Sequence, residues 1–404
     1  MADVVTQAQR ELLEGEYSAG TPWLDDDDVS LLHSQITPYN FIKVVEVSRR
    51  ADNSLAGSRV LLLDQPGNIH SMHFKYKPWT GSYYDLFTLL PPLLPSPSGP
   101  IAILGLAAGT GARLLLRHYP HLELHGWEID EHVIQVARDY FDLEELEDGS
   151  FAAQQLRPYV PFSDSDTDSR LVVHCGDALS SSATVPGGFA GIIVDLYSRG
   201  AVVAPLQRED TWRDLSGRLR EGGKIMVNCG GGCVEGDESV QRDGEAIMLA
   251  TLEAMAAVFP PESILCHRVG DEDGEDDGSD DMDWDGNVMV IAGHDMMPWP
   301  LLPAVPAPAA SSPSLPFLMP SSSSASSPTS SPSSSPSPSL HPGGVGGEES
   351  EQAEGGGAVR EWEEEWRARV PAELEGKVGQ WMPLGRFMEA QRRRMRVKAT
   401  ARLR

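Results

Sequence analysis

Apolar and polar positions follow two different patterns along the chain, and each pattern predicts a different kind of unit. Between residues 39 and 95, short apolar runs are separated by polar turns. This pattern predicts a small antiparallel β-unit, with strands over residues 41–47, 59–63 and 68–72 and a turn over residues 64–67. Residues 1–38, which precede it, are predicted as helix followed by loop.

From residue 101 to residue 297, apolar runs of strand length alternate with segments of helical period. The alternation predicts an α/β fold, in which a mostly parallel sheet is covered by helices on both faces and closes with an antiparallel hairpin. The predicted strands are residues 101–104, 122–127, 171–175, 191–194, 224–228, 263–269 and 287–292. Helices are predicted over residues 82–90, 112–118, 211–219 and 245–258, and residues 144–170 are predicted as irregular.

The last quarter of the chain changes composition twice. Residues 298–357 are rich in Ser and Pro and then in Gly and Glu, without an apolar period, which predicts a disordered insert. Residues 358–384 regain apolar spacing and are predicted as a helical segment that docks on the core. Residues 385–404 form a basic tail, for which a solvated helix end is favoured over a membrane or nucleic-acid patch.

Composition narrows the classes of partner. The 404 residues carry a net charge of -28, which argues against nucleic acid as a partner. No apolar run approaches the roughly 20 residues of a membrane helix, so no membrane partner is expected. Four cysteines are too few for a disulfide framework, and no signal peptide is recognisable. We therefore expect a cytoplasmic protein, with a plastid location as the alternative, and no metal site, because Cys229 and Cys233 lack further ligands nearby.

The most informative stretch covers residues 101–143, where strand, glycine turn, helix, strand and acidic residue follow one another. Such a turn lets backbone approach a ligand, and the helix N-terminus offers free N–H groups. Glu128 ends the second strand, where a carboxylate can accept hydrogen bonds from two ribose hydroxyls. The predicted cofactor-binding residues of this stretch are Gly105, Ala107, Gly109, Gly111, Glu128 and Ile129.

Two ligands, NAD and S-adenosylmethionine, suit this arrangement, and the spacing of glycines in the turn distinguishes between them. A dinucleotide fold favours G-x-G-x-x-G directly after the strand, whereas here Ala107 stands at the second glycine position. The spacing and the following Trp-Glu-Ile-Asp favour an S-adenosylmethionine-like ligand over NAD. An ordinary βαβ unit with a tight turn is the third interpretation.

Further polar residues follow other predicted strands at their carboxyl ends, where ligands bind in open α/β sheets. Asp177 and Ala178 are the remaining predicted cofactor-binding residues, and the carboxylate of Asp177 can accept a hydrogen bond from the exocyclic amine of adenine. Asp195 follows the strand over residues 191–194 and can act as a base or orient a cationic amine. For a lone aspartate, the alternative is a helix N-cap. Tyr197 and His70 complete the catalytic candidates, as a hydroxyl or stacking group and as a second base.

Over roughly residues 39–292 the chain resembles the spermidine synthase family of the class I methyltransferase superfamily. The resemblance rests on YNFIKVVE, RVLLLDQPGNIHS, SYYDLFTLLP, GLAAGTGARLLL, WEIDEHVIQVARDYF, GDAL and GIIVDLYS, in that order. It implies a Rossmann-like methyltransferase fold with a small N-terminal β-unit, and a homodimer. It also implies that Glu128 binds the ribose and that Asp177 binds the adenine side. Asp195 is then the catalytic carboxylate.

The sequence departs from the family on the polyamine side of the site. Aminopropyl-transferring members carry Asp-Ser-Ser-Asp-Pro where this chain has Asp-Leu-Tyr-Ser-Arg, so Ser198 and Arg199 replace an aspartate and a proline. His70 replaces a glutamine, and the segment after it contains Lys75 and Lys77. These changes indicate a divergent member, of the sort found in plants, whose pocket has lost negative charge.

Three functions follow, in this order. The first is a methyltransferase that uses S-adenosylmethionine on an unidentified small-molecule acceptor. The second is an aminopropyltransferase that uses decarboxylated S-adenosylmethionine and a diamine, in polyamine biosynthesis. The third is a catalytically silent nucleotide-binding protein. The loss of an aspartate at Ser198 weighs against the second, and the retention of Glu128, Asp177 and Asp195 weighs against the third.

Overall fold

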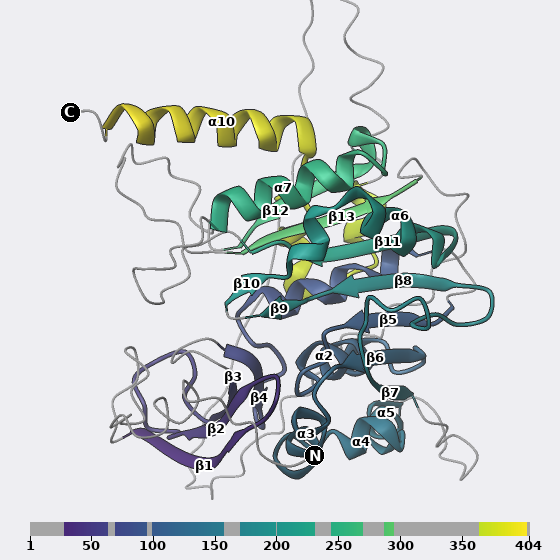
Figure 1. Cartoon of the computed structure of the whole chain (residues 1–404). Helices are drawn as coiled ribbons and strands as arrows, with labels where there is room; N and C mark the ends of the chain where they lie inside the picture. Colours follow the sequence, from purple (N-terminus) through teal and green to yellow (C-terminus); the bar gives the residue numbers. More distant parts are fainter. Residues whose placement is uncertain are drawn as a thin grey trace, which may run out of the picture.

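Two sheets organise the molecule, a small antiparallel one and a large mixed one (Figure 1). The computed structural model describes residues 28–63, 69–94, 99–156, 170–198, 200–230, 244–269, 287–294 and 363–401. The predicted turn at residues 64–67 and the predicted insert at residues 298–357 lie outside these ranges.

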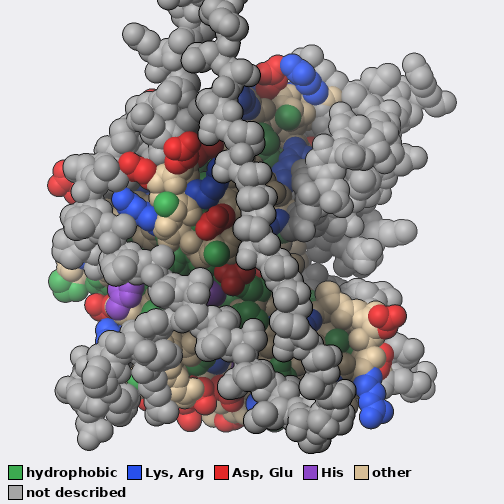
Figure 2. Space-filling view, turned by 180° about the vertical axis from the view of Figure 1, so that it is seen from behind, with side chains coloured by type: hydrophobic (Ala, Val, Ile, Leu, Met, Phe, Trp, Pro, Cys, Tyr) green, Lys and Arg blue, Asp and Glu red, His purple; other side chains and the backbone are tan. Residues whose placement is uncertain are grey.

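The described surface is mixed in charge. On the face shown in Figure 2, Asp and Glu side chains are interspersed with Lys and Arg side chains. Among the described residues, none of the helices is both long enough and apolar enough to cross a bilayer.

The small sheet contains four antiparallel strands in sequence order: β1 (Val29–Ile36), β2 (Phe41–Val47), β3 (Ser58–Leu63) and β4 (Ile69–Phe74). The prediction of helix and loop is therefore wrong for residues 29–36. The apolar alternation of β1 is interrupted by a bulge between Leu31 and His33, and none of its side chains is fully buried. Pairing with β2, rather than its own period, makes this segment a strand.

The large sheet has eight strands in the order β14-β12-β13-β11-β8-β5-β6-β7. They are β5 (Ile101–Leu104), β6 (Leu124–Glu128), β7 (Leu171–Cys175), β8 (Phe189–Val194), β11 (Leu219–Asn228), β12 (Ile264–Arg268), β13 (Val288–Gly293) and β14 (Met382–Pro383). The strands from β7 to β11 are parallel, and β13 is antiparallel to both its neighbours. This confirms the predicted α/β, Rossmann-like fold. The chain order reverses between β5 and β8, which is where such sheets bind ligands.

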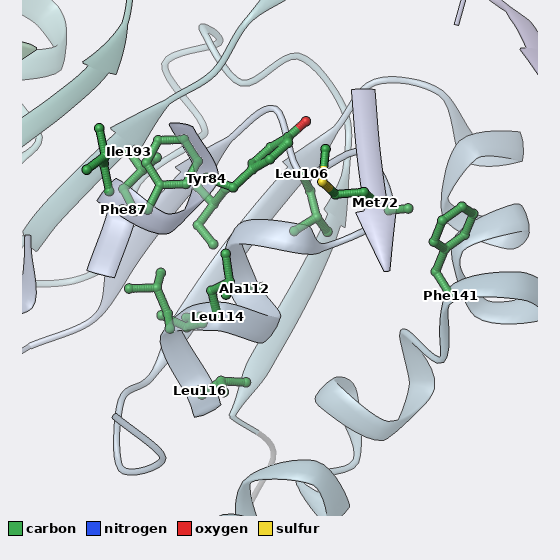
Figure 3. Packing of buried hydrophobic residues seen from close by; sticks show 14 of the residues in the cluster. Met72, Tyr84, Phe87, Leu106, Ala112, Leu114, Leu116, Phe141 and Ile193 are labelled. Atoms are coloured by element: carbon green, nitrogen blue, oxygen red, sulfur yellow. The ribbon is translucent and has the colours of Figure 1, made fainter. Parts of the chain in front are cut away.

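Each face of the large sheet packs against its own layer because successive strand residues point to opposite sides. Ile101 and Ile103 belong to one apolar cluster, whereas Ala102 and Leu104 belong to another. The first cluster joins the sheet to the 3-10 helix η2 (Tyr83–Leu89), α2 (Thr110–His118), α3 (Glu131–Phe141) and the small sheet, and Figure 3 shows part of it. The second joins the sheet to α6 (Glu209–Gly217) and α7 (Gly244–Ala256).

Part of the stretch predicted as irregular is helical. Residues 144–156 form α4 (Glu144–Glu147) and α5 (Ser150–Leu156). Both helices are too short to show a period in the sequence, and they are held by tertiary contacts, since Leu146 and Phe151 are buried in the first cluster. The remaining short elements are η3 (Pro91–Leu93), β9 (Tyr197–Ser198), β10 (Ala201–Val202), η5 (Ala204–Gln207) and η7 (Pro261–Ser263).

The C-terminal residues return to the large sheet and add an edge strand to it. They form η8 (Ala372–Leu374), α9 (Glu375–Val378), β14 and α10 (Leu384–Ala401). Five apolar side chains of this part are buried in the first cluster: Trp366, Val370, Leu374, Val378 and Trp381. The basic tail predicted from residue 385, for which a helix end is favoured, belongs to the helix α10, which lies beside α7 (Figure 1) and is joined to it by a hydrogen bond from Gln391 to Glu245.

Candidate active site

A cavity of about 1190 Å³ lies at the carboxyl ends of β5, β6, β8 and β11. This volume exceeds the roughly 300–1,000 Å³ of a usual small-molecule pocket, so the cavity has room for a nucleoside and a second small molecule. Nine of the predicted site residues line it: His70, Gly105, Ala107, Glu128, Ile129, Asp177, Ala178, Asp195 and Tyr197.

Gly105 brings the nucleotide turn into direct contact with the segment that carries Asp195. Its φ of 91° is one that glycine adopts without strain. A Cβ at this position would lie 2.2 Å from the carbonyl oxygen of Asp195. The absence of a side chain at residue 105 therefore sets the distance between the two halves of the site.

Gly109 and Gly111 contribute to this turn differently from what the sequence predicts. Neither lines the cavity. A Cβ on Gly109 would lie 2.9 Å from Leu143, and a Cβ on Gly111 would lie 3.0 Å from the ring of Phe87. Both glycines face the core and allow α2 to pack closely, and their part in cofactor binding stays a prediction.

Glu128 is buried where β6 ends and faces both the cavity and the glycine turn. Its Oε2 accepts a hydrogen bond from the N–H of Ala107 at 3.0 Å, and its Oε1 accepts one from the N–H of Asp130 at 3.1 Å. Burial raises the pKa of this carboxyl, against the lowering effect of the two backbone donors. The carboxylate thus ties the turn to the end of β6 and presents its remaining lone pairs to a ligand.

Two further residues suit the base of a nucleoside. The side chain of Ile129 is 44% exposed, although it is apolar, and it forms part of the cavity wall. Asp177 lies exposed in the same wall, and its Oδ1 accepts a hydrogen bond from the N–H of Leu179 at 2.8 Å. No helix follows Asp177 in the described structure, so its carboxylate closes a turn and is not a helix cap.

A hairpin of the small sheet covers this nucleotide side. Tyr39 and Asn40, between β1 and β2, line the cavity. Asn40 donates a hydrogen bond to Oδ2 of Asp130 at 2.9 Å, and the hydroxyl of Thr37 donates to the same oxygen. Asp130 also accepts the N–H of His132 at 3.0 Å and so caps α3. Sequence reasoning missed Tyr39 and Asn40, since nothing local connects them with residue 130.

Asp195 follows β8 on the opposite side of the cavity, and two side chains hold its carboxylate. The hydroxyl of Tyr83 donates to Oδ2 at 3.0 Å, and the amide of Asn228 donates to Oδ1 at 3.0 Å. Burial raises the pKa of Asp195 to about 6, and the two hydrogen bonds oppose the rise. A carboxyl with this pKa is ionised near neutral pH and still has useful basicity.

Tyr83 is the reaction-side residue that sequence reasoning missed. It begins η2, and the turn before η2 is held by Asp85, which accepts the N–H of Thr80 at 2.9 Å and the N–H of Gly81 at 2.8 Å. Burial and the neighbouring Asp195 raise the pKa of Tyr83 well above its usual value, so its hydroxyl stays protonated and donates. The Gly-Ser pair before Tyr83 is a local signal for a turn. It does not indicate the partner of Tyr83, because Asp195 lies 112 residues away in the sequence.

The other two catalytic candidates share the cavity with Asp195. The hydroxyl of Tyr197 is 3.4 Å from the carbonyl oxygen of Asn228, and burial raises its pKa, so it is neutral. His70 lies on β4 at the cavity wall. The hydrogen bonds that hold Asp195 come from Tyr83 and Asn228. Ser198 also lines the wall, whereas Arg199 lies outside the described residues.

In the part of the chain that the structure describes, no group of three or more His, Cys, Asp or Glu side chains is placed to hold a metal ion.

Comparison with known proteins gives one similar sequence and several similar folds. No protein-family model matches the chain. A probable polyamine aminopropyl transferase of Bifidobacterium longum is 32% identical over 115 residues, which are 28% of this chain and 24% of that relative. The match therefore spans about a quarter of the relative's length.

Two solved structures have related folds. A spermidine synthase in complex with the transition state analogue AdoDATO is 16% identical, with a TM-score of 0.45, over 66% of this chain and 74% of that one. The spermidine synthase from Thermotoga maritima is 15% identical, with a TM-score of 0.43, over 66% and 73%. Strand order, more than these alignments, defines the fold. The chain is thus a Rossmann-like α/β protein with a small N-terminal antiparallel sheet, and part of its sequence is similar to a probable polyamine aminopropyl transferase.

Proposed function

We propose that this chain transfers an aminopropyl group from decarboxylated S-adenosylmethionine to an amine acceptor. The observation that carries the proposal is Asp195, a carboxyl with a pKa of about 6, which Tyr83 and Asn228 hold in a cavity whose other side suits a nucleoside. The similarity to a probable polyamine aminopropyl transferase favours this function over the methyl transfer that the sequence motifs placed first.

The nucleotide side fits an adenosyl group by its chemistry. Glu128 offers a carboxylate to ribose hydroxyls, Ile129 offers an apolar surface to the base, and Asp177 offers an acceptor to its exocyclic amine. Tyr39 and Asn40 close this side from the small sheet. Gly105 keeps the turn close to Asp195, so a ligand that spans both sides brings its reactive carbon near that carboxylate.

At the reacting end, the proposed chemistry is a displacement at carbon. The acceptor nitrogen forms a bond to the aminopropyl carbon, the bond from that carbon to the sulfonium sulfur breaks, and the sulfur keeps the electron pair as a thioether. The acceptor nitrogen loses one proton. Asp195 is placed to accept it, and Tyr83 and Asn228 orient the carboxylate by donating to its two oxygens. The hydroxyls of Tyr83 and Tyr197 stay neutral, so the negative charge near a cationic acceptor is carried by Asp195.

Methyl transfer makes similar demands on Asp195 and differs in the donor. It is the second candidate because Ser198 stands on the cavity wall where aminopropyl-transferring relatives carry an aspartate. A diamine would then have Asp195 for one amine and a neutral hydroxyl near the other. We therefore expect putrescine to be a poor acceptor compared with other primary amines.

Calorimetric titration and a product assay test the proposal together. The purified protein is titrated with S-adenosylmethionine, with its decarboxylated form and with S-adenosylhomocysteine. It is then incubated with each donor and a panel of primary amines, and methylthioadenosine release is measured. We expect tighter binding of the decarboxylated donor and amine-dependent release of methylthioadenosine. Binding of S-adenosylmethionine with methyl transfer instead would favour the second candidate, and no binding of any of the three would contradict both.

A further inference from the structure

The helix η2 carries Tyr83 to Asp195, and it is held at both ends. At its N-terminal end, the carboxylate of Asp85 accepts the backbone N–H groups of Thr80 and Gly81. At its C-terminal end, the carbonyl oxygen of Leu89 accepts a hydrogen bond from the indole N–H of Trp366 at 3.0 Å. The second contact joins residues 277 positions apart, so its partner belongs to the C-terminal part of the chain.

Trp366 is placed to fix η2 rather than only to fill space. Its side chain is 2% exposed and lies in the same apolar cluster as Leu86 and Leu89. A 3-10 helix has poorer internal hydrogen-bond geometry than an α-helix, so its position depends more on external contacts. A buried carbonyl that loses its donor costs free energy, and a small shift of the helix is one way to recover a partner.

We propose that Trp366 is a positioning residue for the reaction centre, which acts through η2 on the hydrogen bond from Tyr83 to Asp195. The inference rests on the proposed function for its catalytic meaning, because Asp195 is the proposed base. The C-terminal segment would then complete the active site from behind the sheet, where its residues run in Figure 1, without touching the substrate.

The chain supplies a matched control in Trp381. This second tryptophan of the same segment is also buried, at 6% exposure, and its ring centroid is 5.9 Å from that of Trp366. Its indole nitrogen is buried without a hydrogen-bond partner among the described residues. Trp366→Phe and Trp381→Phe therefore remove similar volumes from one cluster, but only the first removes a hydrogen bond to η2.

The test is the titration of the Asp195 carboxyl, followed by NMR in the full-length protein labelled with ¹³C at the aspartate carboxyl carbon and assigned with Asp195→Asn. Loss of the Tyr83 donor disfavours the ionised form and raises the pKa. We expect the midpoint to move to higher pH by about half a unit or more in Trp366→Phe, and to stay unchanged in Trp381→Phe. The acidic limb of the pH–rate profile should move in the same direction.

An unchanged midpoint in Trp366→Phe, or equal movement in both variants, would overturn the inference. If Trp366→Phe does not fold, benzothienylalanine at residue 366 replaces the indole N–H by sulfur at nearly the same shape, and the same midpoint decides. The NMR titration needs no turnover. A protein without aminopropyl transfer would therefore contradict the proposed function, while the titration would still decide the role of Trp366.

Discussion

Glu128 and Asp195, two carboxylates of the cavity wall, differ in what holds them. Backbone N–H groups of Ala107 and Asp130 bind Glu128, so its position follows the turn and the strand end. Side chains of Tyr83 and Asn228 bind Asp195, so its position depends on two other elements. Gly105 links the two sites, because its missing side chain leaves room for the carbonyl of Asp195.

Gly105→Ala tests this link, with Gly187→Ala as the matched control. Both glycines have positive φ, of 91° and 81°, but a Cβ at Gly187 would meet nothing within 4 Å. We expect Gly187→Ala to lower the free energy of unfolding by about 1 kcal/mol, the cost of a side chain at positive φ. Gly105→Ala should cost about 1–3 kcal/mol more, because backbone must move to relieve the clash. Urea unfolding measures both, and equal losses would contradict the close approach.

Asp195→Asn separates stability from activity. The pKa of about 6 in the folded protein is above the roughly 3.9 of an unfolded aspartate, so the folded state binds the proton more tightly. The protonated carboxyl therefore contributes to the stability of the fold. This contribution begins to fall as the pH rises above about 4 and is absent above about 6. We expect the variant to gain up to about 3 kcal/mol at pH 8 and almost nothing at pH 4.

The same variant should lose transfer activity at least about a hundredfold, because the proposed base is gone. In the unaltered protein, transfer should rise with pH through about 6, as Asp195 ionises. Urea unfolding at the two pH values and initial rates across the pH range measure these effects. A variant that keeps its activity would remove Asp195 from the mechanism.

At the scale of elements, the cavity is assembled from pieces that the large sheet alone does not supply. The hairpin between β1 and β2 covers the nucleotide side and is docked through Asp130, the cap of α3. The helix η2 supplies the tyrosine donor on the reaction side. Both elements precede β5 in the chain, so the small N-terminal unit is part of the site.

Thr37→Val tests the docking of the hairpin. The substitution keeps the shape of the side chain and removes the hydroxyl that donates to Asp130. A buried hydrogen bond to a charged group contributes about 1.5–3 kcal/mol, so we expect nucleoside affinity to fall several-fold as Tyr39 and Asn40 lose their position. Ser34→Ala, at an exposed residue of the same hairpin, is the control. Calorimetric titration compares them, and equal affinities would contradict a role for the docked hairpin.

At the scale of the whole molecule, the C-terminal segment packs as one unit with the large sheet. Its tryptophans lie in the apolar cluster that holds η2, and β14 extends the large sheet beyond β12. The hydrogen bond from Gln391 to Glu245 places α10 beside α7. Residues at the end of the chain are therefore needed to bury the surface of elements near its beginning.

Two deletions test this arrangement. Removal of residues 298–357, which the sequence predicts to be disordered, should leave the thermal midpoint within about a degree, because a disordered segment contributes no packed apolar surface. Removal of residues 363–404 should lower it by more than about 5 °C, because buried Trp366, Val370 and Trp381 are lost. Differential scanning calorimetry compares the two proteins. If they behaved alike, the segment would not be docked in solution.

Residues 101–143 show how much of the fold and of the site can be predicted from local sequence alone. A strand, a glycine turn and an amphipathic helix are encoded within a few residues of one another, and parallel strands place their carboxyl ends at one edge. Glu128, Asp177 and Asp195 could therefore be assigned to one cavity from their positions after strands. The α/β fold follows from the same alternation, because each period depends only on neighbouring residues.

Contacts between distant residues decided the rest. Val29–Ile36 is a strand because β2 pairs with it, and residues 144–156 are helical because the core accepts Leu146 and Phe151. Tyr83 reaches Asp195 only once η2 is packed on the large sheet, and Trp366 reaches Leu89 only once the C-terminal segment has returned. A side chain carries no local mark of a partner a hundred or more positions away, so its role appears only when packing brings the two elements together.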